Sequence, residues 1–234
     1  MLLSIYSKLL RYYGHQNWWP VRHSFKPGEL EICIGAILTQ NTNWRNVEAA
    51  LENLAKAKKL SAQDIASSSL PALEKLIKPS GFFRQKARRL KAFCRYVANY
   101  DGNFYRDITR EQLLVINGIG KETADSILLY ACSKPFFVVD AYTKRVFSRL
   151  GFIDEEGYEE IRSLFEDSLP RNAGLYKEFH ALIVEHAKRT CKKEPLCAQC
   201  PLQKECKYSR NAKHSGILGE AKLLRDYKST RGQV

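Results

Sequence analysis

The sequence lacks any run of about 18 apolar residues, so we expect no segment that crosses a membrane as a helix and no membrane partner. Its first residues include Lys8 and Arg11 but no small-residue cleavage site, which predicts an intracellular protein of the cytoplasm or nucleoid. Disulfide bonds are rare in such proteins. Acidic residues are also scarce, because 25 Asp and Glu stand against 38 Lys and Arg, for a formal net charge of +13. This surplus favours a polyanionic partner, of which nucleic acid is the commonest.

Sustained alternation of apolar and polar residues, which is typical of half-buried strands, is absent as well. Apolar residues recur instead at helical spacing, and Ser61, Ser69 and Thr109 stand where helix N-caps are expected. The pattern predicts an all-α protein with helices at 2–13, 28–40, 44–57, 70–78, 86–100, 110–117, 121–133, 140–151, 158–169 and 175–191. The apolar run at 136–140 fits either a short strand or an extended linker, and we expect a basic tail at 208–234.

The seven cysteines fall into two groups. Cys33, Cys94 and Cys132 lie in apolar surroundings, where a cysteine is usually a small buried hydrophobic residue. The other four follow a C-x5-C-x2-C-x5-C pattern: Cys191, Cys197, Cys200 and Cys206. Two centres compete for them, a four-cysteine zinc site and a four-cysteine iron–sulfur cluster. Zinc sites usually take their thiolates from CxxC pairs, and only one such pair exists here, so the spacing favours the cluster.

A glycine-rich turn separates two of the predicted helices. Gly118 and Gly120 allow a tight turn and the close approach of a partner, and Lys121 stands beside the first amides of the next helix. Free amides, a helix dipole and a cation together favour a phosphate. Further along, Asp140 ends an apolar run and begins another helix, where it fits either an N-cap or a functional carboxylate.

The order of these features resembles the helix-hairpin-helix DNA glycosylase superfamily, and in particular its endonuclease III branch with a 4Fe–4S cluster. The segments that carry the resemblance are LTQNT at 38–42, PSGFFRQKARRL at 79–90, INGIGKETA at 116–124, VVDAYTKRV at 138–146 and the four clustered cysteines. The resemblance extends over about residues 24–207. It implies two helical lobes, a six-helix domain with the hairpin at 24–132 and a second domain with the cluster loop at 1–23 plus 133–207.

The resemblance also implies roles for single residues. Asp140 corresponds to the catalytic aspartate, whose negative charge stabilises the positive charge that develops on the sugar as the glycosidic bond breaks. Gln40 corresponds to the residue that fills the space left by the flipped base. The expected DNA contacts are Gln40, Gly81, Arg84, Lys86, Gly118, Gly120 and Lys121, and the expected cluster ligands are Cys191, Cys197, Cys200 and Cys206.

Two departures from the endonuclease III pattern bear on the chemistry. The first gap of the cysteine run is one residue shorter than the usual C-x6-C, a change that a loop tolerates. Bifunctional members have a lysine two residues beyond the second glycine of the hairpin, and that lysine forms a Schiff base with the sugar. Glu122 stands at this position here, and Lys121, one helical step away, is expected to face the phosphates. The sequence therefore predicts a monofunctional glycosylase with water as nucleophile.

Trp18 and Trp19, followed by Pro20, are similar to a feature of the 3-methyladenine DNA glycosylases related to endonuclease III. An alkylated purine is cationic and stacks well on electron-rich rings, so we expect the two tryptophans to line a pocket for a base such as 3-methyladenine. Some members of the 3-methyladenine glycosylase group lack the cysteine loop, which this chain has.

Two alternative functions stay open. One is a bifunctional endonuclease III-type glycosylase and AP lyase that acts on oxidised pyrimidines, and the other is a non-catalytic DNA-binding module. We expect a monomer that acts on double-stranded DNA containing a damaged base.

DNA binding is expected to weaken steeply with salt, because the hairpin and the basic residues of 84–91 are predicted to contact phosphates. If these groups neutralise ~5 phosphates, the slope of log Kobs against log salt is about −4 to −5. The measurement is the affinity for a DNA duplex over a series of salt concentrations. A slope near zero would contradict the predicted basic face.

Overall fold

The computed structural model describes residues 1–214, and these form helices joined by turns, with no strand in that range. The predicted all-α class is confirmed. The chain divides into two compact units. We call Asn17–Val138 with Pro170–Lys177 the hairpin unit, and Met1–Gln16 with Val139–Leu169 and the described residues from Glu178 onward the cysteine-loop unit. Within the described range, no helix has the length and apolar character needed to cross a membrane.

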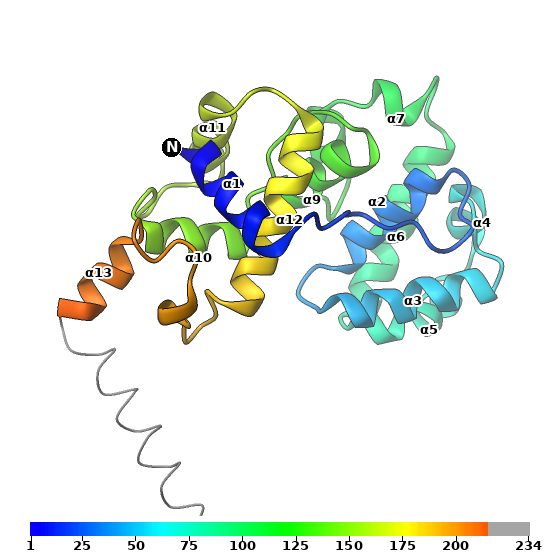
Figure 1. The fold of residues 1–234 in the computed structure, drawn as a ribbon. Coiled ribbons are helices and arrows are strands. Elements are labelled where there is room, and N and C mark those ends of the chain that lie inside the picture. The colour runs from blue at the N-terminus through cyan, green and yellow to red at the C-terminus, as the bar shows by residue number, and fades with distance from the viewer. Residues whose placement is uncertain (215–234) are drawn as a thin grey trace, which may run out of the picture. The chain divides into compact units, whose positions relative to one another are not determined.

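The hairpin unit is built around one buried helix. The helices in this unit are α2 (Gly28–Leu38), α3 (Trp44–Lys56), α4 (Ala62–Ser67), α5 (Leu70–Ile77), η1 (Lys78–Ser80), α6 (Phe83–Ala98), α7 (Phe104–Asp107), α8 (Arg110–Leu114), α9 (Lys121–Ser126) and η2 (Ile127–Ala131). Every residue of α2 from Leu30 to Leu38 is buried, and α3, α6, α9 and η2 contact this helix. The green and blue helices of Figure 1 that carry these labels form the unit.

The helix starts of the hairpin unit follow the predicted caps. The side chains of Ser61, Ser69 and Thr109 each accept a hydrogen bond from a backbone N–H in the first turn of α4, α5 and α8. The helices α4 and α7 are six and four residues long, too short to show a period in the sequence, and only the cap of α4 was expected.

The cysteine-loop unit has an aromatic core. Its elements are α1 (Leu2–Tyr13), α10 (Ala141–Leu150), α11 (Tyr158–Ser168), most of α12 (Ala173–Arg189), η3 (Cys197–Gln199) and α13 (Lys207–His214). The ring of Phe147 lies 4.7 Å from that of Phe165 and 6.2 Å from that of Phe179, both edge to face. The rings thereby join α10, α11 and α12.

The structure answers two questions that the sequence left open, one about the run 136–140 and one about the tail at 208–234. The run 136–140 is an extended connection without strand pairing, so the linker interpretation is correct. The tail predicted at 208–234 begins as a helix, because α13 spans Lys207–His214 and contacts α10. The rest of the predicted tail lies outside the described residues.

The side chains of Arg110 and Asp125 join the helices on the two sides of the hairpin. Arg110 Nε donates to Asp125 Oδ1 at 2.6 Å and Nη2 donates to Oδ2 at 3.1 Å, and Asp125 is fully buried. Asp125→Ala is expected to lower the free energy of unfolding by about 3–5 kcal/mol, because it leaves the guanidinium buried without its carboxylate. Urea unfolding measures this loss.

A matched control is Glu52→Ala, which removes the exposed partner of Lys56 on α3. This change is expected to leave the urea midpoint almost unchanged, since exposed ion pairs contribute little to stability. Equal losses in the two variants would contradict the stabilising role of the Arg110–Asp125 pair.

Candidate functional site

Asp140 is the N-cap of α10 in the cysteine-loop unit. Its Oδ1 accepts hydrogen bonds from the backbone N of Thr143 at 2.7 Å and from Thr143 Oγ1 at 2.9 Å. Its Oδ2 lies 3.6 Å from Nε2 of His180 on α12. The two interpretations of Asp140 are therefore compatible, because one oxygen caps the helix and the other faces an imidazole. The side chain keeps 14% of its surface exposed, so it is not sealed in the core.

The surroundings of Asp140 hold its carboxyl group ionised. Burial acts to raise the pKa, but the imidazole of His180 and the two hydrogen bonds from Thr143 outweigh it, so the pKa lies below its usual value of 3.8. The N-terminal end of the α10 dipole favours the negative charge in the same direction. The result is a mostly buried carboxylate that is charged at neutral pH.

His180 was not among the residues predicted from the sequence. It is 6% exposed and belongs to the apolar stretch FHALIV at 179–184, on the buried side of α12. A histidine in such a stretch is the one signal that the sequence offered, and it does not say which partner the ring meets. Only the packing of α12 against the start of α10 brings the ring to Asp140.

In the hairpin unit, Gln40 is tied to the glycine turn. Its Nε2 donates to the carbonyl oxygen of Gly118 at 3.2 Å and to Thr123 Oγ1 at 2.9 Å, and Nη1 of Arg89 donates to its Oε1. Gly118 has a φ of +88°, and a Cβ there would lie 2.2 Å from Cγ of Arg89. The turn thus needs glycine both for its backbone conformation and for the space that Arg89 fills.

The phosphate contact predicted for Lys86 is wrong. Lys86 is 1% exposed, and its Nζ donates to the carbonyl oxygens of Leu38 at 2.8 Å and Ser80 at 2.6 Å. Lys86 lies on the same face of α6 as the buried Leu90 and Phe93, at spacings of four and seven residues, so a basic stretch hides one inward position. Burial, with a smaller contribution from Arg89, lowers its pKa to about 8. The predicted contact Arg84 is exposed on the same helix.

Phe82 is an exposed aromatic residue that was not among the site residues predicted from the sequence. Its side chain is 65% exposed, and its φ of +44° is uncommon for a residue with a Cβ. It follows Gly81, whose φ is +68° and beside which a Cβ would meet open space. The pair directly precedes the basic helix α6, so a large apolar ring lies next to exposed arginines.

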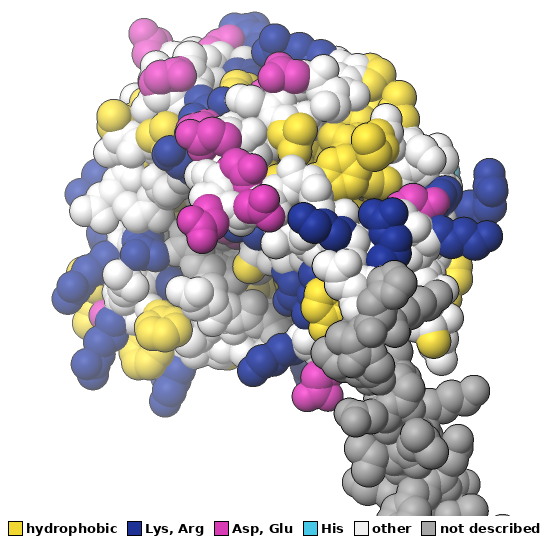
Figure 2. Space-filling view, turned by 90° about the vertical axis from the view of Figure 1, so that its left-hand side faces the viewer, with side chains coloured by type: hydrophobic (Ala, Val, Ile, Leu, Met, Phe, Trp, Pro, Cys, Tyr) yellow, Lys and Arg dark blue, Asp and Glu magenta, His cyan; other side chains and the backbone are white. Residues whose placement is uncertain are grey.

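The residues after the hairpin lie at the start of α9. Gly120 is the extended N-cap with open space beside it, and Lys121 and Glu122 are exposed in the first turn. Glu122, which the resemblance predicts to stand where bifunctional enzymes have their lysine, has an exposed side chain. Lysine and arginine side chains are spread over the face shown in Figure 2, as the net charge of +13 requires.

The two predicted pocket tryptophans differ in their packing. The ring of Trp19 lies 5.1 Å from that of Trp44 and 5.3 Å from that of Tyr130, and Trp19 Nε1 is buried without a hydrogen-bond partner. A Cβ at Gly35 would come within 3.0 Å of Trp19, so a glycine of α2 makes room for this ring. Trp19 is therefore in part a packing residue, and both tryptophans keep some surface exposed.

The backbone after the tryptophans is fixed by a buried acid. Glu31 of α2 is 2% exposed, and its carboxylate accepts hydrogen bonds from the backbone N–H groups of Arg22 and His23. The ring of His23 lies 2.9 Å from the same carboxylate. A buried carboxylate is costly unless it is paired, and this one is used to hold the segment that follows Trp18 and Trp19.

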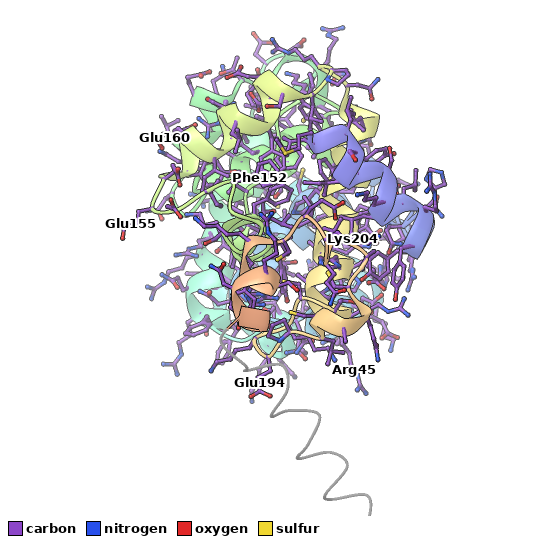
Figure 3. The ribbon with its side chains drawn as sticks, turned by 60° about the vertical axis from the view of Figure 1, so that its left-hand side comes forward. Arg45, Phe152, Glu155, Glu160, Glu194 and Lys204 are labelled. Atoms are coloured by element: carbon purple, nitrogen blue, oxygen red, sulfur yellow. The ribbon has the colours of Figure 1, made fainter. Side chains whose placement is uncertain are left out.

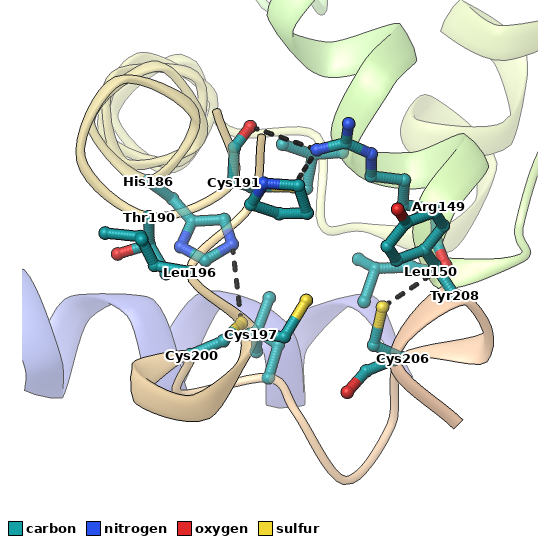
Figure 4. A pocket seen from close by; sticks show the side chains of 14 residues that line it. Arg149, Leu150, His186, Thr190, Cys191, Leu196, Cys197, Cys200, Cys206 and Tyr208 are labelled. Atoms are coloured by element: carbon teal, nitrogen blue, oxygen red, sulfur yellow. Dashed lines mark hydrogen bonds between the residues drawn. The ribbon is translucent and has the colours of Figure 1, made fainter. Parts of the chain in front are cut away.

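The four clustered cysteines line one pocket of the cysteine-loop unit (Figure 4). None of them forms a disulfide, and the remaining lining includes the apolar side chains of Val146, Leu150, Pro195, Leu196 and Leu202. The charged residues of the loop face outward, as Figure 3 shows for Glu194. An apolar pocket with four converging thiols fits a group that takes thiolates and excludes water.

Two side chains from helices approach the cysteine sulfurs. Arg149 Nη1 lies 3.3 Å from Sγ of Cys191, and Nε2 of His186 lies 3.8 Å from Sγ of Cys200. Burial, with the neighbouring cysteines adding to it, raises the pKa of Cys197 and that of Cys200, the latter to about 12. Burial thus favours the protonated form of these two thiols, and a bound cationic centre would have to replace their protons.

Residues 34–171 match the family model of the HhH-GPD superfamily of base excision DNA repair proteins. The chain belongs to this superfamily. A relative from Methanocaldococcus jannaschii, provisionally named a DNA repair glycosylase, is 50% identical over 212 residues, which cover 87% of this chain and 94% of the relative. As a member of the HhH-GPD superfamily with such a relative, the protein is a DNA N-glycosylase.

Two solved structures extend the comparison. The 3-methyladenine DNA glycosylase of H. pylori, bound to 1,N6-ethenoadenine, is 34% identical with a TM-score of 0.66, and the match covers 80% of this chain and 96% of that one. An endonuclease III–DNA complex is 21% identical with a TM-score of 0.77, and the match covers 91% and 97%. The second likeness shows the shared fold of the HhH-GPD superfamily.

The environment of Asp140 predicts a pH-dependent contribution to stability. Because its pKa is lower in the folded chain than the usual 3.8, the carboxylate stabilises the fold above about pH 4, and this contribution is lost as the pH falls through the folded pKa. The difference in unfolding free energy between wild type and Asp140→Asn is expected to be largest at neutral pH and to shrink in acid. Urea unfolding at neutral pH and at about pH 3 measures it. A difference that stays constant would show that the folded chain does not favour the carboxylate.

Proposed function

We propose that this DNA glycosylase is monofunctional and hydrolyses the N-glycosidic bond of an alkylated purine such as 3-methyladenine. Two features of the chain carry the proposal. The carboxylate of Asp140 is held ionised, and an acid, Glu122, stands at the position of the Schiff-base lysine. The first group suits hydrolysis, and the second removes the nucleophile of the lyase pathway.

The chemistry follows from the charge on the sugar. Loss of the base leaves positive charge at the sugar, and a carboxylate fixed beforehand stabilises it without reorganisation. Thr143 holds Oδ1 of Asp140, which leaves Oδ2 to oppose the sugar or to orient the attacking water. His180, 3.6 Å from Oδ2, acts as a positioning residue for that oxygen.

The absence of an amine at 122 excludes an imine from this position. A carboxylate cannot condense with the aldehyde form of the sugar, and Glu122 is exposed at the start of α9. We assign the adjacent Lys121 to the phosphate side of the hairpin, next to the open Gly120. The DNA backbone would then stay intact after the base is removed.

The two tryptophans support the choice of substrate. Trp18 and Trp19 offer aromatic surface that is not fully buried, and cationic bases bind well to such rings. Alkylation weakens the glycosidic bond, so the enzyme needs neither a strong acid nor a covalent intermediate. The H. pylori relative, named for 3-methyladenine and solved with 1,N6-ethenoadenine, agrees with this substrate class.

The hairpin unit is proposed to hold and distort the DNA. Gly118, Gly120 and Lys121 would bind the backbone, and Arg84 would contact a phosphate. Gln40 and Phe82 would enter the duplex beside the flipped base, since apolar and amide side chains commonly fill such gaps. Phe82 suits this role because its ring is already 65% exposed.

We infer that Cys191, Cys197, Cys200 and Cys206 hold a 4Fe–4S cluster, with zinc as the alternative. The four side chains line one pocket of the cysteine-loop unit, and their spacing contains one CxxC pair flanked by two single cysteines. This spacing favours a four-cysteine iron–sulfur cluster, because zinc sites usually take their thiolates from CxxC pairs. When bound, the cluster supplies four metal–thiolate bonds that fold the loop.

Asp140→Asn is expected to bind damaged DNA as well as wild type does and to remove the base about two to three powers of ten more slowly, because it keeps the shape and loses the charge. The measurement is single-turnover release of 3-methyladenine from a duplex. Wild-type rates in the variant would show that Asp140 serves only as a helix cap.

The same assay tests whether the enzyme is monofunctional. Wild-type product strands are expected to break only after hot alkali, and borohydride is expected to trap no adduct. Efficient nicking and trapping by the wild type would refute the monofunctional proposal and support the bifunctional one, and Lys121→Gln would then identify the amine. Binding without release of any base from a panel of damaged duplexes would support the non-catalytic module.

Metal analysis of the purified protein is expected to find four irons per chain, with the brown colour of an iron–sulfur protein. Cys197→Ser is expected to lower the iron content and to destabilise the loop, since metal binding there is also folding energy. Stoichiometric zinc without iron would refute the cluster. Cys94→Ser is the matched control, because Cys94 is buried in the other unit and should not change the metal content.

A further inference from the structure

Lys86 connects two loops of the hairpin unit that are far apart in the sequence. One loop follows α2 at Leu38 and contains Gln40, and the other follows η1 at Ser80 and contains Phe82. The Lys86 ammonium donates to the carbonyl oxygens of Leu38 and Ser80, two residues before Gln40 and Phe82. One side chain thereby fixes the start of both loops.

The choice of a charged residue at this position is unusual. Lys86 is 1% exposed, and among residues 1–214 no carboxylate pairs with it; its ammonium donates to two backbone carbonyls. Burying an ammonium group is costly, and stability alone would favour an apolar side chain. The ends of α2 and η1 explain the attraction, because carbonyls at a helix C-terminus carry partial negative charge. A lysine reaches both ends at once, which no apolar side chain can do.

The connection continues from Lys86 to the hairpin. One turn further along α6, Arg89 donates to Gln40, and Gln40 donates to the Gly118 carbonyl. The first loop is therefore held at its base by Lys86 and at its tip by Arg89. The second loop is held by the Lys86 side chain at its base and by local backbone bonds, from Gly81 N to the Lys78 carbonyl and from Lys86 N to the Phe82 carbonyl. Both the ammonium and the backbone N–H of Lys86 thus bind this loop, on either side of Phe82 with its exposed ring and left-handed backbone.

We propose that Lys86 is a positioning residue that sets the spacing of the loops of Gln40 and Phe82 for entry into the DNA, and that it contacts no phosphate. The proposal rests on the proposed DNA role of these two loops. It assigns a function to the one buried lysine of α6, a basic helix whose exposed cations would bind the DNA backbone.

The first experiment compares three substitutions at this position. Lys86→Met has a similar length and no donor, Lys86→Gln can reach one carbonyl, and Lys86→Arg keeps several donors. Affinity is measured for a duplex with a tetrahydrofuran abasic-site analogue at a series of salt concentrations. The Met variant is expected to bind about three- to tenfold more weakly, since its loops must be ordered on binding, with Gln intermediate and Arg closest to wild type.

The salt dependence separates positioning from phosphate contact. The slope of log Kobs against log salt is expected to be unchanged in the three Lys86 variants, because no counterion-releasing contact is lost. Arg84→Gln is the matched control on the same helix, where loss of a phosphate contact is expected to reduce the slope by about one. A reduced slope in the Lys86 variants would overturn the proposal.

Amide hydrogen exchange measures directly how well the two loops are ordered. Amides at 39–43 and 80–83 are expected to exchange faster in Lys86→Met than in wild type, with the rest of the hairpin unit unchanged. Lys86→Gln is expected to affect only the loop whose carbonyl it no longer reaches, so this variant tests the proposal even if Lys86→Met does not fold. Wild-type exchange in both loops of Lys86→Gln would overturn it.

A further variant separates this inference from the proposed function. Phe82→Ala is expected to weaken binding to the abasic duplex, because it removes the ring itself. If Phe82→Ala binds as wild type does, the DNA role of this loop is wrong and the inference falls with it. If Phe82→Ala weakens binding but Lys86→Met and Lys86→Gln do not, the DNA role stands and the inference about Lys86 is wrong.

Discussion

The chemistry that we propose for this glycosylase depends on a carboxylate that is mostly buried and still charged. Asp140 is 14% exposed, yet Thr143 and His180 lower its pKa, and the α10 dipole acts in the same direction. Each of these residues also has a structural role. The backbone N–H of Thr143 donates to Asp140 in the N-cap of α10, and His180 is a buried residue of α12. The fold therefore orients the negative charge before any DNA binds, which is the condition for electrostatic stabilisation of a cationic sugar.

In the hairpin unit, the basic residues of α6 lie in different environments. Arg84 is exposed and free to meet phosphates, Arg89 fills the space at Gly118 and holds Gln40, and Lys86 is buried at the base of two loops. Three basic residues within six positions of one helix thus have three different tasks.

Local features of the sequence predicted the fold well. Helical spacing, the caps at Ser61, Ser69 and Thr109 and the absence of alternation gave the all-α class, because these signals come from neighbouring residues. A candidate site residue could be named from the sequence only where the residue carries its own signal, as with Asp140 at the end of an apolar run. The partners depend on packing between distant segments. Burial of Lys86 follows from the inward face of α6, the approach of His180 to Asp140 follows from the packing of α12, and the exposure of Phe82 follows from a left-handed turn.

The central claim is that Asp140 opposes positive charge on the sugar, and binding of a charged analogue tests it most directly. A duplex with a pyrrolidine abasic-site analogue carries that positive charge, and a duplex with tetrahydrofuran has the same shape without it. Wild type is predicted to bind the pyrrolidine duplex at least about a hundredfold more tightly, and Asp140→Asn is predicted to bind the two duplexes alike. Equal binding by wild type, or a preference for pyrrolidine that survives in Asp140→Asn, would contradict the account.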